Sequence, residues 1–394
     1  MRLIYQIAEV TFWGSVFFIF YSYALYPFLL FILSRGKKDN KNIYGKNDNL
    51  PVASLLISVH NEEEVIEEKI LSVLDSNYPL AKYEILVGSD ASTDNTDLII
   101  EKLDREYENV HFFPFDERGG KGNVINKLEQ RAKGEILVFT DANIIFEKQT
   151  LYEIVKHFKN KQVGLVDANM INRGLKRDGI SYQEKAYVSR EVLIKYREGL
   201  IWGTMMGPFG GCFAVRKTLF TPVPGNALVD DFYINMKILS KGKMALNNLN
   251  ARVYEDVSNN LPEEYRRKKR IAAGNFQNLK WFSHLLFSNR KGLSFSFFSH
   301  KVIRWIIPFL IILAFLSNII LLQSGWLYSY AFYFQVLLLL IPFIDYFLRK
   351  IKIHVVILRF VTHFYFMNLA LLSGFFKFLK GVKSNVWQPT KRNQ

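Results

Sequence analysis

Residues 52–59 read VASLLISV, an apolar run that ends at a polar segment, His60-Asn61-Glu62. Two later runs have the same form, a short apolar strand followed by an aspartate: YEILVGS at 83–89 before Asp90, and EILVFT at 135–140 before Asp141. Runs of this kind, alternating with longer polar helical runs, predict an α/β domain with a mainly parallel sheet over residues 51–281.

The polar residues after these strands predict a binding crevice. A single aspartate after a strand more often caps a turn or a helix, whereas three polar strand ends in succession favour a site. In open α/β sheets, ligands bind outside the carboxyl ends of the strands. Asp90 opens a tight turn, DASTDNT, before a helix near Thr96. An aspartate there can accept hydrogen bonds from a base or a ribose.

Gly119-Gly120-Lys121-Gly122 is a glycine-rich loop before a predicted helix at 123–133. Backbone N–H groups and a helix N-terminus suit phosphate, and Lys121 adds a point charge. The loop lacks the spacing of a Walker A motif. By itself it is equally compatible with a plain turn.

Asp141-Ala-Asn143 presents two oxygen ligands of the kind that Mg²⁺ or Mn²⁺ uses together with a substrate diphosphate. Asp167-Ala-Asn169 repeats the tripeptide after the run VGLV, and it remains an alternative metal motif. We expect the metal at Asp141 and Asn143.

Long apolar stretches flank this domain. Residues 10–34 and 305–344 carry no charged side chain, and a bilayer core needs about 20 apolar residues per helix. We therefore predict an N-terminal anchor and two C-terminal spans interrupted near Gln323-Ser324-Gly325: 10–34, 302–323 and 327–348. Buried core helices of a soluble protein are the alternative.

A third C-terminal segment, 355–376, is predicted as either a transmembrane or an interfacial helix, and 282–301 as an interfacial segment. The Lys-rich flank after residue 34 and the basic segment at 349–352 place the catalytic domain on the cytoplasmic side of the cell membrane. The tail after Phe376 is also basic, which favours an interfacial helix, because a third full span would place the tail outside.

The formal net charge is +15. With apolar spans present, membrane lipids are a better partner for this charge than nucleic acid, for which no binding motif is present. The chain has one cysteine, Cys212, so no internal disulfide forms and a reducing compartment fits.

Taken in order, the motifs resemble those of family-2 glycosyltransferases. They run over roughly 50–280 and comprise ISVHNEEEVIEEKILSVLDSNYP, VGSDASTDNT, GGKGNVIN, KGEILVFTDAN, GPFGGCFAVRK at 207–217, VDDFYINMKILSKG at 229–242 and RRKKRIAAGNFQ at 266–277. The resemblance implies a GT-A domain, a Rossmann-like nucleotide-diphospho-sugar transferase fold. With the apolar stretches, it gives a fold with one N-terminal and two or three C-terminal transmembrane helices.

The resemblance also implies roles for individual residues. It assigns nucleotide and donor binding to His60, Glu62, Asp90, Lys121 and Asp141, the floor under donor sugar and acceptor to Gly210 and Gly211, catalysis to Asp231 as the base, and the membrane-proximal mouth of the site to Arg267 and Arg270. Asp230, beside the base, would orient Asp231 or raise its pKa as a like charge. Without the resemblance, the acidic start of a helix is the favoured interpretation of the Asp230-Asp231 pair.

Two departures from the family pattern bear on function. Asn143 replaces the second aspartate of the D-x-D motif, which puts metal affinity in question. Arg267-Lys-Lys-Arg270-Ile271 stands in place of Q-x-x-R-W, and the missing tryptophan weakens the case for processive synthesis.

We therefore predict an inverting, membrane-bound hexosyltransferase that uses a nucleotide sugar, with uracil as the expected base, and a lipid-linked or glycan acceptor. A processive synthase of extracellular polysaccharide and a catalytically dead membrane scaffold remain as alternatives.

Overall fold

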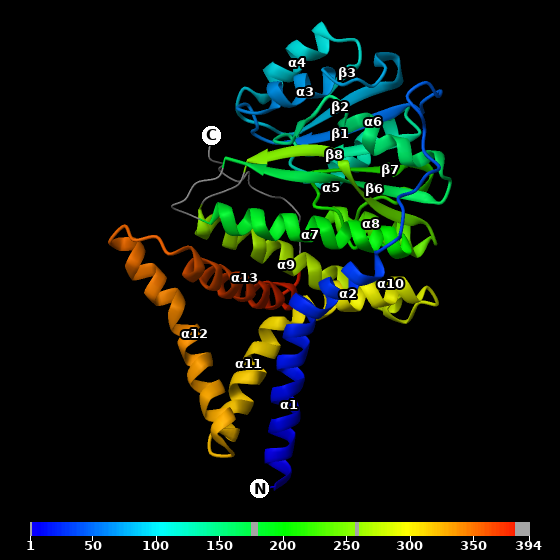
Figure 1. The fold of residues 1–394 in the computed structure, drawn as a ribbon. Coiled ribbons are helices and arrows are strands. Elements are labelled where there is room, and N and C mark those ends of the chain that lie inside the picture. The colour runs from blue at the N-terminus through cyan, green and yellow to red at the C-terminus, as the bar shows by residue number, and fades with distance from the viewer. Residues whose placement is uncertain (1, 175–179, 257–259, 383–394) are drawn as a thin grey trace.

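The structure is a computed structural model that describes residues 2–174, 180–256 and 260–382. It has three levels (Figure 1): an α/β domain, a layer of helices that run beneath it, and apolar helices that extend away from that layer. The predicted α/β fold with apolar helices at both ends is confirmed.

An eight-stranded sheet forms the centre of the domain, in the order β3-β2-β1-β4-β7-β6-β8-β5. Its strands are β1 (Ala53–Val59), β2 (Tyr83–Asp90), β3 (Val110–Phe115), β4 (Ile136–Thr140), β5 (Ile145–Phe146), β6 (Val163–Arg173), β7 (Cys212–Arg216) and β8 (Met244–Asp256). The first four strands pair in parallel, so the carboxyl ends of β1, β2 and β4 meet at one edge. Strand β7 runs antiparallel to β4 and to β6, so the second half of the sheet is mixed.

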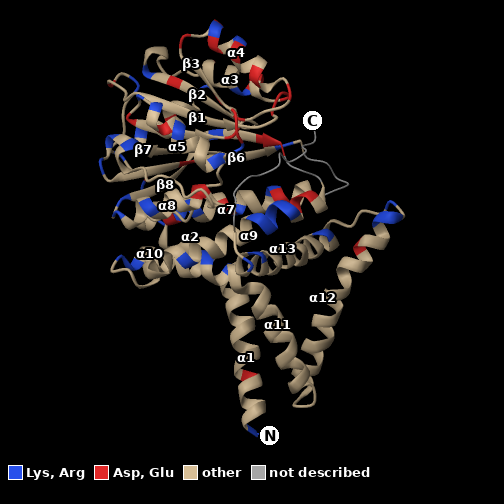
Figure 2. Ribbon diagram, turned by 180° about the vertical axis from the view of Figure 1, so that it is seen from behind, with Lys and Arg blue, Asp and Glu red and all other residues tan. Residues whose placement is uncertain are grey.

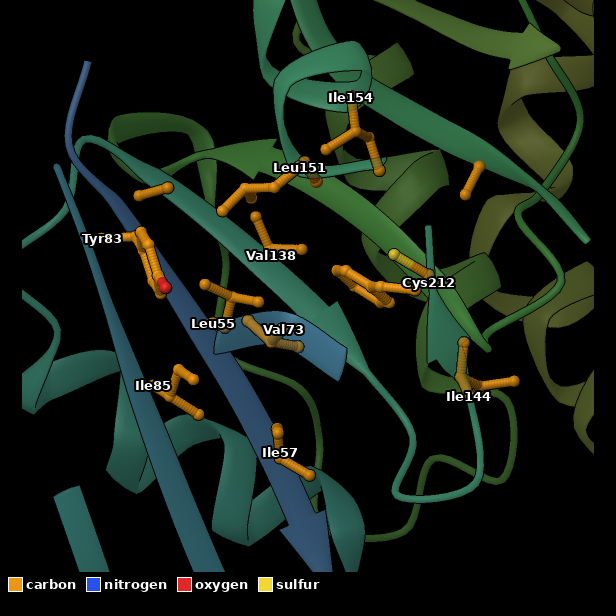
Figure 3. Packing of buried hydrophobic residues seen from close by; sticks show 14 of the residues in the cluster. Leu55, Ile57, Val73, Tyr83, Ile85, Val138, Ile144, Leu151, Ile154 and Cys212 are labelled. Atoms are coloured by element: carbon orange, nitrogen blue, oxygen red, sulfur yellow. The ribbon is translucent and has the colours of Figure 1, made fainter. Parts of the chain in front are cut away.

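Both faces of the sheet are buried, which explains the continuous apolar runs in the sequence. Successive side chains of a strand point to opposite faces. Along β1, Leu55 and Ile57 therefore join the apolar cluster shown in Figure 3, whereas Leu56 joins the cluster on the other face. Helices α3, α4 and α6 cover the first cluster, and α5, α8 and α9 cover the second.

The helices of the domain and of the layer beneath it lie between the strands in the sequence or, for α9 and η5, after the last strand. They are α3 (Ile66–Leu74), α4 (Thr96–Glu106), α5 (Lys121–Arg131), α6 (Thr150–Val155), α7 (Ser181–Trp202), α8 (Asp230–Ser240) and α9 (Leu261–Phe282), with short 3-10 helices η2 (Leu80–Lys82), η3 (Lys156–Lys159), η4 (Lys217–Leu219) and η5 (Ser283–Phe287). Helix α5 begins at Lys121, two residues before the predicted start, because Gly120 has a left-handed φ of 81° that ends the preceding loop.

Four helical stretches are long and apolar enough to cross a membrane: Arg2–Leu33, Lys291–Leu321, Trp326–Lys350 and Val356–Leu379. They comprise α1 (Arg2–Phe20), the π-helix η1 (Tyr21–Leu25) and α2 (Tyr26–Leu33), then α10 (Lys291–Ser296), the π-helix η6 (Phe297–Val302) and α11 (Ile303–Leu321), then α12 (Trp326–Lys350) and α13 (Val356–Leu379). Figure 2 shows α1, α11 and the lower part of α12 almost without charge, while Lys and Arg gather near α9, α10 and α13 and at the upper end of α12.

Helix α13 does not run alongside α1 and α11 but lies beneath α9, across their direction (Figures 1 and 2). Gly374 allows this close crossing, because a Cβ there would lie 2.4 Å from Ala272 Cβ and 2.9 Å from the Lys269 carbonyl oxygen. Phe375 packs on Phe276 of α9, with ring centroids 5.0 Å apart. One side of α13 is thus part of the domain core.

Candidate active site

The carboxyl end of β2 holds the glycine-rich loop in place. Asp90 is fully buried, and its carboxylate accepts hydrogen bonds from the backbone N–H groups of Gly119 (2.7 Å) and Gly120 (3.0 Å). Arg118 Nε donates to the same carboxylate at 3.2 Å. Asp90 therefore fixes the loop that precedes α5, in addition to lying where the base was predicted to bind.

His60, at the end of β1, completes this cluster. Its Nδ1 lies 2.9 Å from the Asp90 carbonyl oxygen, and the Arg118 guanidinium contacts its Nε2. Since a carbonyl only accepts and a guanidinium only donates, the proton of a neutral His60 is on Nδ1. Nearby, the Glu62 backbone N–H donates to Thr96 Oγ1 at 2.8 Å, which joins the β1 loop to the start of α4.

Lys121, in the first turn of α5, is the meeting point of three predicted site residues. Its Nζ lies 2.6 Å from Asp141 Oδ1, after β4, and 3.9 Å from Asp230 Oδ2, in the first turn of α8. Burial opposes the charge of Lys121, but Asp141, Asp230 and Asp231 outweigh this and raise the pKa of its ammonium. The group therefore stays cationic at neutral pH, at the carboxyl edge of the sheet.

Asp231 is a buried carboxyl group beside this cluster, with 9% of its surface exposed. Burial, and then the like charge of Asp230, raise its pKa from 3.8 to about 7, although Lys121 acts in the opposite direction. A carboxyl group with a pKa near the working pH is suited to act as a general base.

Gly210 and Gly211 lie directly against the acidic groups. Gly210 has a φ of 85°, and a Cβ there would lie 2.7 Å from Asp231 Oδ2. The Gly211 carbonyl oxygen accepts a hydrogen bond from the Asp141 N–H at 3.1 Å. Both positions need glycine: Gly210 for its backbone conformation and its close approach to Asp231, and Gly211 because a Cβ there would lie 2.4 Å from Met170 Cε.

The basic segment of α9 contributes Arg270 to the same region. The pKa of Arg270 is lowered by burial and by Arg267, while Asp230, Asp141 and Asp231 oppose the shift. Arg267 is directed to other carboxylates: its Nη1 lies 3.4 Å from Glu264 Oε1, and Glu264 raises its pKa. Of the two predicted arginines, only Arg270 is coupled to the acids around Lys121.

The residues of the predicted metal site fit a hard cation in part. The Asp141 side chain is 38% exposed and offers carboxylate oxygens. Asn143 is buried, and its Nδ2 donates to Glu255 Oε1 at 3.2 Å. Its amide oxygen is therefore the atom that can bind a metal ion. No group of three or more His, Cys, Asp and Glu residues suited to a metal occurs in the described part of the chain. A cation here would need ligands from a substrate diphosphate as well.

The alternative motif at Asp167 has a different environment. Asp167 is buried, and its Oδ2 lies 3.5 Å from Lys195 Nζ and 3.2 Å from Asn247 Nδ2. Lys195 also lies 3.2 Å from the centroid of the Phe209 ring, just before Gly210. These partners make Asp167 part of the support under the glycine floor.

Two contributors to the site were not predicted from the sequence. Arg118 contacts both His60 and Asp90, and Lys69 of α3 reaches the turn that carries Asp141. Arg118 precedes the glycine-rich loop directly, so its position was a usable signal. Lys69 lies within an ordinary amphipathic helix pattern, which carries no such signal.

Residues 54–222 match the family Glycosyl transferase family 2. The chain is 25% identical to the beta-monoglucosyldiacylglycerol synthase of Nostoc sp. (strain PCC 7120) over 71% of this chain and 60% of that protein. It is 26% identical to the poly-beta-1,6-N-acetyl-D-glucosamine synthase of Staphylococcus epidermidis over 42% of this chain and 38% of that protein. The chain thus spans about 60% or less of these curated relatives.

A solved structure extends the likeness to almost the whole chain. The mannosyltransferase PcManGT from Pyrobaculum calidifontis, in complex with GDP-Man and Mn²⁺, has a TM-score of 0.68. The alignment covers 96% of this chain and 98% of that chain, at 19% sequence identity. At this identity the likeness establishes the fold.

The fold is that of the GT-A nucleotide-diphospho-sugar transferases, here combined with apolar helices at both ends. Residues 54–222 of the chain form a family-2 glycosyltransferase domain.

Proposed function

We propose that this protein transfers a single sugar, with inversion, from a nucleoside diphosphate sugar to a lipid-linked or glycan acceptor at the cytoplasmic face of the cell membrane. The observation that carries the proposal is the convergence of Asp141, Asp230 and Asp231 on Lys121 at the carboxyl edge of the sheet, beside Gly210.

Asp231 is the proposed base. With a pKa of about 7, its carboxylate takes the proton of the acceptor hydroxyl as the oxygen attacks the anomeric carbon. Gly210, which lacks a side chain, lets the backbone lie close to Asp231 and is the proposed floor under the two sugars. Attack from the face opposite the leaving group inverts the anomeric configuration.

Lys121 and Arg270 are the proposed partners of the leaving nucleoside diphosphate. Both cations interact electrostatically with Asp141, Asp230 and Asp231. In this position they would stabilise the negative charge that develops on the leaving phosphate. The cluster of His60, Asp90 and Arg118 receives the base. Mg²⁺ or Mn²⁺, held by Asp141 and the Asn143 amide oxygen, would neutralise phosphate charge when bound.

The acceptor is proposed to reach the site from the membrane side. Helices α9 and α13 lie between the catalytic domain and the apolar helices (Figure 1), and α9 carries Arg270. Ile271 stands where processive synthases of the family carry tryptophan, which favours addition of one sugar over polymer synthesis.

Membranes containing the protein, incubated with a panel of nucleotide sugars and MgCl2 or MnCl2, test the proposal through release of nucleoside diphosphate. We expect release from one donor and a loss of roughly a hundred- to ten-thousandfold in Asp231→Asn. A product enlarged by one sugar supports the proposal, and a polymer supports a processive synthase.

Two results would contradict the assignment. Unchanged turnover in Asp231→Asn would remove Asp231 as the base. Nucleotide binding without turnover of any donor, in membranes that retain their own lipids, would support the non-catalytic scaffold.

A further inference from the structure

Lys69 is a fully buried lysine of α3 to which the proposed reaction gives no role. Its Nζ donates to Thr140 Oγ1 at 2.9 Å and to the Ile144 carbonyl oxygen at 2.6 Å. The same ammonium lies 3.7 Å from the centroid of the Phe146 ring. Among the described residues it forms no ion pair within 4.0 Å, so neutral oxygens and the face of a ring are its partners.

The two oxygens that Lys69 binds flank the turn that carries Asp141 and Asn143. Thr140 is the last residue of β4, and Ile144 directly precedes β5. One buried ammonium therefore ties both ends of the turn to α3. The remaining backbone bonds of the turn are few: the Ile144 N–H donates to the Asp141 carbonyl oxygen at 3.3 Å, and the Asp141 N–H donates to Gly211.

Stability alone does not account for a lysine at this position. Burying an ammonium group without a counter-ion is costly, and burial here lowers the pKa of Lys69 to about 7. A methionine would fill the same space between α3 and the sheet at lower cost. What it would not do is hold the Thr140 hydroxyl and the Ile144 carbonyl oxygen in fixed positions.

We propose that Lys69 is a positioning residue that holds the turn at 141–143 in the shape that receives the donor diphosphate and its divalent cation. The proposal rests on the proposed function, because that function makes the turn part of the donor site. Lys69 acts through the turn and does not touch the donor. Its loss should therefore weaken nucleotide binding without unfolding the domain.

Calorimetric titration of the full-length protein in detergent with UDP and with GDP, each with MnCl2, tests this proposal. For Lys69→Met we expect the dissociation constant of the bound nucleotide to rise at least about tenfold, as for other residues that orient ligand groups. The midpoint of thermal unfolding should change little, because removal of a buried charge offsets the loss of two hydrogen bonds.

Ser72→Ala is the matched control. Ser72 lies on the same helix, and its hydroxyl accepts a hydrogen bond from the Phe146 N–H at 3.2 Å, beyond the turn. We expect its dissociation constant to equal that of the wild type.

The outcomes separate the two proposals. If the wild type binds neither nucleotide, the proposed function fails. If the wild type binds and folded Lys69→Met binds equally well, the role of Lys69 is refuted. Should Lys69→Met not fold, Thr140→Val removes one of the two acceptors and decides the matter: weaker binding supports the proposal, and unchanged binding refutes it.

Discussion

Asp231 combines burial with a neighbouring like charge, and the two together raise its pKa to about 7. A base acts in its deprotonated form, so kcat/KM should rise with pH and level off above about 7. Asp230→Asn removes the like charge and should move this acidic limb to lower pH. The measurement is a pH profile of kcat/KM for both proteins, and an unchanged limb in the variant would contradict coupling between the two carboxyl groups.

The same shift has a consequence for stability. The folded pKa of Asp231 lies above its ordinary value of 3.8, so the folded state binds more protons than the unfolded state between these two values. The contribution of this group to the free energy of unfolding therefore falls as pH rises from about 4 to about 7. Asp231→Asn should remove this part of the pH dependence, which urea unfolding at several pH values measures.

Gly210 is the second residue whose role depends on its contact with neighbouring groups. An alanine there would adopt a left-handed backbone at a cost of about 1–2 kcal/mol, and its Cβ would lie 2.7 Å from Asp231 Oδ2. We expect Gly210→Ala to remain folded but to lose turnover at least about tenfold, a loss that corresponds to about 1.4 kcal/mol.

Gly242→Ala is a control, because its φ is also positive, at 77°, and no atom lies within 4 Å of its added Cβ. Equal turnover in the two variants would contradict a steric role of Gly210 beside Asp231.

Among the elements, α7 connects the membrane anchor to the glycine floor. Glu198 is fully buried; its Oε1 accepts from Tyr26 Oη of α2 at 2.7 Å and lies 2.8 Å from His300 Nδ1 of η6. Its Oε2 accepts from the Met206 N–H at 3.0 Å, in the loop that leads to Gly210. One carboxylate thus joins three segments that are far apart in the sequence.

Glu198→Gln should destabilise the protein by about 1–3 kcal/mol, because an amide cannot accept on both sides and leaves a buried group unpaired. Tyr26→Phe removes one donor and should have a smaller effect. Thermal unfolding in detergent measures both changes. Equal stability of Glu198→Gln and the wild type would mean that the junction does not hold the anchor to the domain.

At the scale of the whole molecule, the position of α13 sets the topology. If α13 lies in the membrane interface, Lys37 and Lys380 share one side of the membrane, and Ser324, between α11 and α12, lies on the other. We expect Lys37→Cys and Lys380→Cys to react with an impermeant maleimide in inverted vesicles, and Ser324→Cys in right-side-out vesicles. Cys212 is buried and should contribute little background. Labelling of Lys380→Cys together with Ser324→Cys would show that α13 spans the membrane.

Local pattern was sufficient for the fold class, the family and the apolar helices. A strand buried on both faces needs a continuous apolar run such as 52–59, and a helix that crosses a bilayer needs about 20 apolar residues. Both requirements concern residues that are neighbours in the chain, so the strands and the apolar helices can be predicted from the sequence alone. The basic residues that flank the apolar helices are also a local pattern, and they predict which side of the membrane the α/β domain occupies.

Long-range packing decided the rest. The contacts of Lys121 with Asp141 and Asp230, of Arg118 with Asp90, and of Lys69 with the turn at 141–143 all join separate elements. The crossing of α13 under α9 depends on the absence of one Cβ at Gly374. An apolar sequence indicates that a helix is shielded from water. It does not indicate whether lipid or protein covers the helix, because apolar side chains are stable in both environments. Only the folded chain determines which groups become partners.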